Sequence, residues 1–321
     1  MDMDPTVSTR SEESDEAEAV NMLKVLPVDC IAKVLSLTTP ADACRSSLVS
    51  TSFKSVAESN AVWDCFVPPE SDYLFNNSSS SSSSSSLPVS SKKELFLYLC
   101  DHPLLIQDGK LSLSLEKKSG KKCYMLSPKD LIIVWIDTPA YWRWTSLPHT
   151  RFPEVAELIK VCWLEIRGRI NTCMLSPATL YAAYLVFKTT TGSYGFESQP
   201  IEVEVGLVGG EIHKQTVYLD AYGGRRPQYQ IVPRRIGIFN RPFRRIPGFQ
   251  APQPQPKENE ELNGLKYPKE RVDGWLEIEL GEFFNRSGKD NGELEMSVLE
   301  VNGGNWKGGL IVQGIEIRPK P

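Results

Sequence analysis

Nine consecutive serines at positions 78–86 divide this chain of 321 residues. A serine run cannot bury apolar surface to offset the entropy lost on ordering, so it predicts a flexible linker and not a packed element. The hydrophobic pattern also changes across the tract. We therefore expect a short N-terminal module and a long C-terminal module, joined by a Ser-rich linker over residues 69–91.

Short amphipathic helices are predicted on the N-terminal side of the tract. Apolar residues recur there at helical spacing, and each run follows a residue suited to starting a helix. The start signals are Pro27, the pair Thr39 and Asp42, and Ser50 or Ser52. About forty residues of such helices have little core of their own, so a partner is expected to complete the module.

The C-terminal side has the two-residue period of β-strands. Strict alternation or two-sided apolar runs predict strands, and the Gly, Pro, Asn and Asp turns between them favour an antiparallel sandwich. The strand candidates are "CWLEIRGRI" at 162–170, "LYAAYLVF" at 180–187, "IEVEVGLV" at 201–208, "WLEIEL" at 275–280 and the final "GLIVQGIEIRP". One segment, "PEVAELIKV" at 153–161, predicts a short helix or turn. Trp163 and Trp275 fall on polar faces and are expected to cover the sheet under loops.

Charge, cysteines and apolar runs exclude several classes of protein. Residues 1–21 predict a disordered acidic tail without the basic and apolar regions of a secretory signal, and we find no apolar run long enough to span a bilayer. A formal net charge of -4 does not indicate a membrane or nucleic acid as partner of the whole chain. Seven scattered cysteines and three histidines predict reduced thiols, no metal site and no cofactor.

The stretch "LPVDCIAKVLSLTTPADACRSSLVSTSFKSVAESNAVWDCFVP" is similar to an F-box, which we assign to residues 22–68. The resemblance implies docking on the Skp adaptor of a cullin-RING ubiquitin ligase. It implies that the docking residues are Leu26, Pro27, Ile31, Leu35, Leu48, Val49 and Trp63. For each apolar side chain among them, packing inside the F-box is the alternative.

The segments "WIDTPAYWRW", "FPEVAELIKVCWLEIRGRINTCMLSPATLYAAYLVFK" and "DGWLEIELGEFFN" resemble the phloem lectin domain of plants, the phloem protein 2 or Nictaba-like family. The likeness runs from about Tyr124 to Pro319. Together the two resemblances imply an α+β multidomain chain. A small all-helical F-box would be followed, over residues 92–321, by an antiparallel β-sandwich of jelly-roll type with lectin function.

The lectin resemblance places a carbohydrate site at Trp135 and Trp142. A pyranose has an apolar face that lies flat on an indole, while its hydroxyls need polar partners at the side. Asp137 and Tyr141 are near enough in sequence to supply them. The resemblance further implies that the loop "EFFNRSGKDNGELE", with Phe284 and Glu293, closes the site. The alternative is that the rings are core, which is the interpretation we prefer for Trp144.

A basic, Pro-rich insertion occupies residues 223–263, with seven arginines between 225 and 245 and no acid in that span. Such a patch suits an acidic protein surface, nucleic acid or a nuclear import factor, and a solvated loop without such a role is the alternative.

Taken together, these features predict a non-catalytic substrate-receptor subunit of an SCF-type (Skp-cullin-F-box) ubiquitin ligase, located in cytoplasm and nucleus. Its lectin domain would capture glycoproteins that carry N-acetylglucosamine or a related glycan. The alternative is a stand-alone carbohydrate-binding protein with a vestigial F-box. A hydrolase is disfavoured because no acid pair can be tied to a pocket and no nucleophile motif is present.

Overall fold

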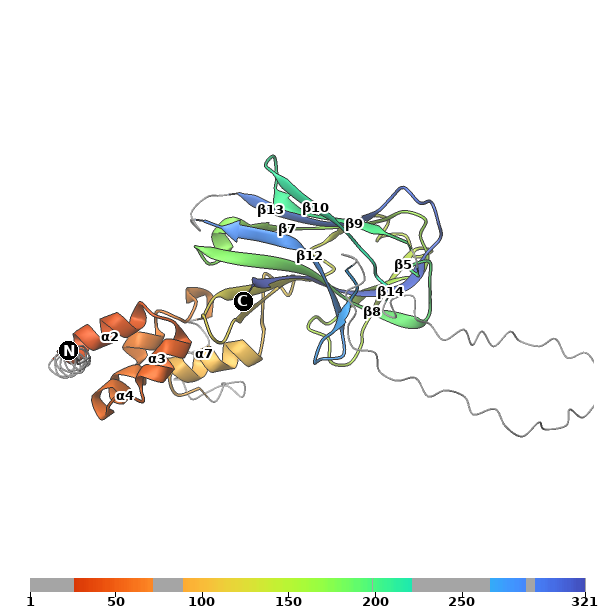
Figure 1. The fold of residues 1–321 in the computed structure, drawn as a ribbon. Helices are drawn as coiled ribbons and strands as arrows, with labels where there is room; N and C mark the ends of the chain where they lie inside the picture. Colours follow the sequence, from red (N-terminus) through yellow and green to blue (C-terminus); the bar gives the residue numbers. More distant parts are fainter. Residues whose placement is uncertain (1–25, 72–88, 198, 221–265, 287–291, 321) are drawn as a thin grey trace, which may run out of the picture.

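The computed structural model describes residues 26–71, 89–197, 199–220, 266–286 and 292–320 (Figure 1). The expected acidic tail, serine tract and basic insertion lie outside these residues. The helices are α2 (Val28–Ser36), α3 (Pro40–Ser46), α4 (Thr51–Ala57), α5 (Asn60–Trp63) and α7 (Lys92–Asp101), with short 3-10 turns η1 (Pro69–Ser71) and η2 (Thr172–Met174). The strands are β1 (Leu104–Ile106), β2 (Leu111–Leu115), β3 (Lys122–Leu126), β4 (Ile132–Ile133), β5 (Trp142–Thr145), β6 (Val155–Leu158), β7 (Leu164–Asn171), β8 (Thr179–Tyr194), β9 (Ile201–Leu207), β10 (Ile212–Val217), β11 (Lys269–Glu270), β12 (Leu276–Asn285), β13 (Glu293–Glu300) and β14 (Gly308–Pro319).

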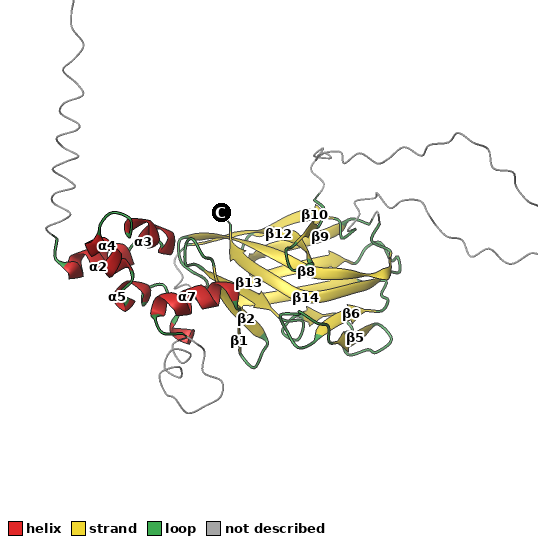
Figure 2. Cartoon of the chain, turned by 90° about the horizontal axis from the view of Figure 1, so that it is seen from below, coloured by secondary structure: helices red, strands yellow, loops and turns green. Residues whose placement is uncertain are grey.

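Two antiparallel sheets face each other over the main core, with the helices gathered at one end (Figures 1 and 2). The larger sheet has the order β1-β2-β3-β14-β8-β12-β11, and the β5–β6 hairpin joins it through β14. The smaller sheet has the order β10-β9-β13-β7-β4. The predicted antiparallel sandwich is therefore confirmed, as are the strands expected from alternation.

Strand β14 pairs with β8 along its whole length but changes partner on its other side. Ile311 and Val312 pair with β6, whereas residues 315–317 pair with β3. The register shifts between Val312 and Gly314, as expected for a β-bulge. A Cβ at Gly314 would lie 2.1 Å from the carbonyl oxygen of Leu126, so only glycine allows β3 to approach at this point.

The segment expected to be a helix or turn at 153–161 contains strand β6 instead. Its buried residues Val155, Ala156 and Leu158 pair with β5 on one side, and the strand meets β14 on the other. Pairing on both edges satisfies the backbone of β6 and overrides a spacing that also fits a helix.

The predicted helix starts of the N-terminal module are confirmed. Thr39 accepts a hydrogen bond from the backbone N–H of Asp42 at 3.1 Å, and Ser50 does the same for Phe53 at 3.2 Å. Each hydroxyl satisfies one of the amide groups left open at a helix N-terminus. Pro27 occupies the N-cap of α2, one residue before the first helical residue.

The helical unit does not end at the serine tract, because α7 completes its core. Leu95, Phe96 and Leu99 of α7 are buried in one cluster with Ile31 and Trp63. The centroid of the Phe96 ring lies 5.3 Å from that of Trp63, an aromatic contact that adds to the burial. The expected domain start at residue 92 is therefore wrong in terms of packing, and the tract does not separate two independent cores.

The same helical unit also contacts the sandwich. Leu115 of β2 contributes to its buried cluster, and the backbone N–H of Ala41 donates to the carbonyl oxygen of Lys118 at 3.2 Å. Lys122 of β3 forms an ion pair with Glu70 at 2.9 Å. The β2–β3 hairpin thus joins the N-terminal helices to the larger sheet.

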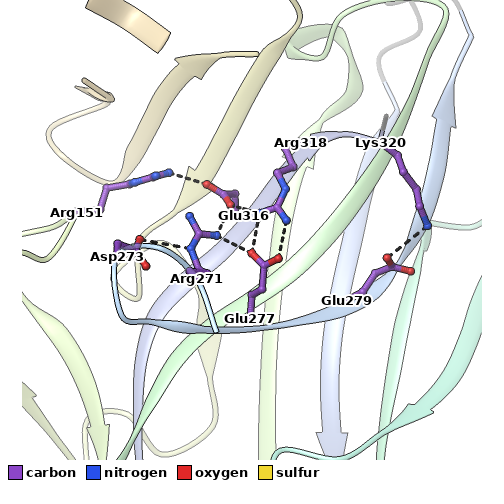
Figure 3. Close-up of polar contacts among 8 residues, drawn as sticks. All are labelled: Arg151, Arg271, Asp273, Glu277, Glu279, Glu316, Arg318 and Lys320. Carbon is purple, nitrogen blue, oxygen red and sulfur yellow. Dashed lines mark hydrogen bonds and ion pairs between the residues drawn. The ribbon is translucent and has the colours of Figure 1, made fainter. Parts of the chain in front are cut away.

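An ionic network holds two surface segments against the outer face of the larger sheet (Figure 3). Glu316 of β14 is buried and bonds Arg151 at 2.8 Å and Arg271 at 2.6 Å. Arg318 bridges Glu316 and Glu277. Burial disfavours ionisation of Glu316, but the charges of Arg151 and Arg271 outweigh it and hold its pKa at about 2.

We predict that Phe96→Ala lowers the free energy of unfolding of the intact chain by about 3–5 kcal/mol, as for other buried phenylalanines. Phe96 is buried in the contact between α7 and the F-box helices. Urea denaturation measures the loss. The control is Tyr98→Ala on the same helix, whose ring is half-buried and stacks on His102, and which should cost much less. A loss for Phe96→Ala no larger than that of the control would contradict a shared core.

Glu316→Gln should lower stability at neutral pH by roughly 3 kcal/mol, because the neutral amide removes the buried negative charge that pairs with Arg151, Arg271 and Arg318. The folded pKa of about 2 lies below the ordinary value of 4.5, so the ionised carboxylate stabilises the fold above pH 4.5. This contribution is lost as pH falls from 4.5 toward 2, where the variant and the parent should converge. Denaturation at several pH values tests this, with the exposed Glu282→Gln as control. A gap that stays constant down to pH 2 would rule it out.

Candidate functional site

Trp135 lies where the edge strand β4 leaves the smaller sheet. Its indole is 41% exposed, and its φ of 62° is unusual for a bulky residue. The preceding residue, Val134, donates its N–H to the carbonyl oxygen of Glu165 in β7 at 3.1 Å, which fixes the start of the loop. Strained backbone conformations of this kind cost of order 1–3 kcal/mol and gather at binding sites.

A series of turns brings Tyr141 under Trp135. The N–H of Thr138 donates to the carbonyl of Trp135 at 2.9 Å, and the N–H of Tyr141 donates to the carbonyl of Thr138 at 2.9 Å. The two rings lie with centroids 5.3 Å apart at 43°. Asp137 is exposed at the tip of the turn. The structure therefore brings together three of the expected site residues, Trp135, Asp137 and Tyr141.

Trp142 differs from the expectation, because its ring is only 2% exposed. It starts β5 opposite Leu158 and packs in the main core with Val161 and Leu164. Its indole Nε1 has no hydrogen-bond partner among the described residues. In this structure Trp142 cannot offer a face to a sugar, so it supports the loop from below.

Phe284 and Glu293 also differ from the expectation, because they lie at the other end of the sandwich. Glu293 pairs with Asn171 at the C-terminal end of β7, whereas Trp135 lies beside the N-terminal end of that strand. Phe284 is exposed and lines a cavity of about 610 Å³ with His213 and Glu282. Strand β7 separates these residues from Trp135, so they do not close a site around it.

Three other tryptophans can now be placed. Trp275 is fully buried against Val186 under a loop, as expected, with the Lys188 ammonium 4.6 Å from its ring centroid. Trp163 was also expected to be covered but is 43% exposed. Trp144 was expected in the core but is half-exposed. It lies on the same face of β5 as Trp142, two residues further along the strand, where that face is no longer covered.

The expected adaptor-docking residues fall into two groups. Ile31, Leu35 and Trp63 are buried in the helical core, which is the alternative foreseen for them, and so cannot contact a partner directly. The other four are exposed, with Leu48 at 86% and Val49 at 63%. The exposed large apolar side chains of this unit are Leu26, Val28, Val34, Leu37, Leu48 and Val49. Such a concentration on one small unit is typical of a surface that a partner covers.

Sequence reasoning missed two exposed aromatic residues, Tyr194 and Trp306. Tyr194 ends the longest strand, and Trp306 lies in a Gly-rich loop before β14. Neither belongs to a recognisable motif. The one available signal was a pair of glycines on each side of Asn305 to Lys307, which predicts a turn but not an exposed ring.

The described residues contain neither a cluster of metal ligands nor a membrane-spanning helix. Within residues 26–71, 89–197, 199–220, 266–286 and 292–320, His, Cys, Asp and Glu side chains nowhere gather in threes as metal ligands would. Across these same ranges, each helix is too short or too polar to cross a bilayer.

Comparison with known families matches both parts of the chain. The family described as Phloem protein 2 matches residues 121–319. The chain belongs to the phloem protein 2 family. The F-box domain family matches residues 23–65, so this phloem protein 2 chain also carries an F-box.

Related F-box proteins of the phloem protein 2 family occur in Arabidopsis thaliana. The F-box protein PP2-B1 is 46% identical over 92% of this chain and 89% of its own length. The F-box protein PP2-B10 is 44% identical over 91% of this chain and 92% of its own length. The two-module arrangement is thus shared over nearly the whole chain.

Among solved structures, a family 35 carbohydrate binding module from Clostridium thermocellum covers 61% of this chain and 96% of its own. It is 11% identical, with a TM-score of 0.30. A Podospora anserina mannanase with a module of the same kind gives a TM-score of 0.29 at 8% identity, over 62% of this chain and 28% of its own. Neither likeness bears on what the phloem protein 2 domain binds.

We predict that two neighbouring tryptophans respond oppositely to substitution. Trp142→Leu should lower the free energy of unfolding by several kcal/mol, because it leaves a cavity in the core, whereas Trp135→Leu should cost about 1 kcal/mol or less. Trp142→Phe keeps most of the ring and removes an unpaired N–H, so it should cost less than Trp142→Leu. Urea denaturation of the three variants tests this. Equal losses for both leucine variants would contradict the assignment of Trp142 as support and Trp135 as surface.

Proposed function

We propose that this protein is the substrate receptor of an SCF-type ubiquitin ligase, with a phloem protein 2 domain that binds glycans on target proteins. The observation that carries the proposal is the position of two uncovered apolar surfaces at separate ends of the molecule. One lies on the F-box helices and the other includes Trp135, in the loop between β4 and β5. The helices and β5 lie at opposite ends of the molecule (Figure 1).

The F-box surface suits an apolar groove on a Skp-type adaptor. Ile31, Leu35 and Trp63 hold the helices together, which leaves Leu48 and Val49 to face a partner in the turn between α3 and α4. Apolar anchors of this kind supply most of the affinity at a helical interface. The cullin would join through the adaptor.

The loop around Trp135 suits a sugar ring. Stacking of a pyranose on Trp135 uses an exposed indole face, which Tyr141 supports from one side. The exposed carboxylate of Asp137 can accept hydrogen bonds from sugar hydroxyls. N-acetylglucosamine or a related glycan is the ligand we propose, and Trp142 contributes only as packing beneath the loop.

In this role the chain acts by proximity and not by bond chemistry, since it raises the effective concentration of target lysines near the charged ubiquitin-conjugating enzyme. We propose that it works in the cytoplasm and nucleus. All seven cysteines are free, which is in keeping with a reducing compartment. From the sequence alone, we also propose that the Arg-rich insertion at 223–263 binds an acidic partner.

The test of the adaptor contact is the double variant Leu48→Ala/Val49→Ala in the full-length protein. We expect adaptor binding, measured by surface plasmon resonance, to weaken at least about tenfold, since two exposed anchors are truncated. The melting temperature should not change, because both side chains are exposed. Val272→Ala, which truncates an even more exposed apolar residue outside the F-box, is the control.

A failure of the unmodified protein to capture the adaptor would instead favour a stand-alone lectin with a vestigial F-box. The glycan part is tested separately on a glycan array, where Trp135→Leu should lose binding and Phe284→Ala should retain it. Undiminished binding by Trp135→Leu would reject the proposed sugar site.

A further inference from the structure

The cavity of about 610 Å³ that Phe284 lines lies between strand β12 of the larger sheet and the β9–β10 hairpin of the smaller sheet. On the β12 side its wall consists of five consecutive residues, 282–286. Successive side chains of a strand point to opposite faces. A cavity lined by such an unbroken run therefore lies along the edge of the strand and not over one of its faces. Its volume is in the usual range of ligand sites.

The edge of β12 that faces this cavity is open. Strand β12 pairs with β8 along its whole length, whereas β11 pairs with its other edge only at Leu276 and Glu277. At Glu279 the side-chain amide of Gln215 from β10 takes the place of a strand, since it donates to the backbone carbonyl oxygen at 3.0 Å. From Gly281 onward, none of the described strands pairs with this edge. The backbone N–H and C=O groups of such an edge are a template for an added strand.

Gly281 determines where the two sheets separate. A Cβ at this position would lie 3.0 Å from the side chain of Val205 in β9 and 3.4 Å from the ring of His213 in β10. Glycine therefore lets the strands approach closely at this point, and the cavity opens beyond it. The open edge is thus recessed between two walls. One extended segment fits there, whereas the edge of a second sheet, which brings a neighbouring strand with it, does not.

The walls of the cavity combine apolar side chains with charges. Phe284 is 52% exposed and Ile212 is 50% exposed, although both are large and apolar. The exposed Glu211 and Arg286 line the same cavity from the two walls. Apolar groups beside an open strand edge suit the alternate side chains of an extended peptide. The two charges suit a peptide that carries both a basic and an acidic residue.

Direct contacts connect the floor of the cavity to the F-box helices. The buried side-chain amide of Asn285 donates to the carbonyl oxygens of Thr172 at 3.2 Å and Ser176 at 3.1 Å. The hydroxyl of Ser176 accepts from the N–H of Lys122 at 3.1 Å, and the ammonium group of Lys122 pairs with Glu70. The cavity therefore lies at the end of the sandwich that carries the F-box helices.

We propose that this cavity binds an extended segment of a target protein, which adds a strand to the open edge of β12. The segment alternates apolar and polar side chains, so that apolar ones contact Phe284 and Ile212. Five residues of extended chain span about 17 Å, which matches the five residues of β12 and its end that line the cavity. The inference rests on the proposed receptor role only in calling the occupant a target. The contact itself needs neither sugar nor adaptor.

The experiment selects peptides from a random heptapeptide library on the full-length protein and measures their dissociation constants by fluorescence anisotropy. Ile212→Ala/Phe284→Ala should weaken binding of the selected peptides about tenfold or more, as expected when two apolar anchors are truncated. The melting temperature should not change, because both side chains are exposed. Trp306→Ala, which removes an about equally exposed ring outside the cavity, is the matched control.

Two further measurements test the added strand itself. In a paired strand only alternate residues direct their N–H toward one neighbour, so methylation of one alternate set of peptide nitrogens should abolish binding and methylation of the other set should not. Hydrogen exchange within residues 281–285 should slow when a peptide binds. Equal binding by both methylated sets would overturn the inference, as would a library that yields no peptide whose binding the double variant weakens.

Other occupants of the cavity give different results. A dimer that dissociates in Ile212→Ala/Phe284→Ala would assign the cavity to a second copy of the chain. Peptide binding that appears only when residues 223–263 are deleted would assign it to the chain's own insertion. Either result overturns a target as the occupant.

The test is also separate from that of the proposed function. Ile212→Ala/Phe284→Ala should leave adaptor and glycan binding unchanged, and Trp135→Leu should lose glycan binding but keep peptide binding. If the unmodified protein binds peptides in this way but captures neither adaptor nor glycan, the proposed function fails and the peptide site stands.

Discussion

Both ends of this protein depend on strand β14 and its change of partner at Gly314. Before the bulge β14 pairs with β6, which leads to β5, Trp142 and the loop of Trp135. After the bulge it pairs with β3, whose hairpin with β2 contacts the F-box helices. The bulge lies between these two pairings, where it bends β14 and marks the change of neighbour. The continuous ladder with β8 keeps both halves in one sheet.

The sequence allowed much of the fold to be predicted, because its signals there are local. Alternation along β7, β9 and β12, and the helix starts at Thr39 and Ser50, depend on neighbours within a few residues. The errors arose where distant contacts decide. Residues 153–161 fit a helix until β5 and β14 pair with both edges of β6. The serine tract marked a change in composition, whereas Phe96 packs across it onto Trp63.

The candidate site could be predicted only in part, for a similar reason. Trp135, Asp137 and Tyr141 come together through turns within seven residues, so their neighbourhood is readable from sequence. Whether a ring faces solvent depends on strand register, and Trp142 is buried because it starts β5 opposite Leu158. Phe284 and Glu293 lie far away because the antiparallel pairing places them at the other end of β7. The positions of Tyr194 and Trp306 depend on the β8–β14 ladder and on the bridge of Lys307 to Val161, which sequence alone does not reveal.

The arrangement bears on how a receptor of this kind would present a target. Strand β14, twelve residues long, runs between the end of the sandwich where β6 pairs with it and the end that faces the F-box, a distance of about 40 Å at the usual rise of a strand. Because α7 and the β2–β3 hairpin pack the F-box helices onto the sheet, that distance is set by structure and not by the length of the serine tract. A tethered target samples many positions, whereas a target held through a packed body is offered at a restricted set of them. On the proposed function, the position of the glycan on the target would then decide which lysines come within reach of the conjugating enzyme.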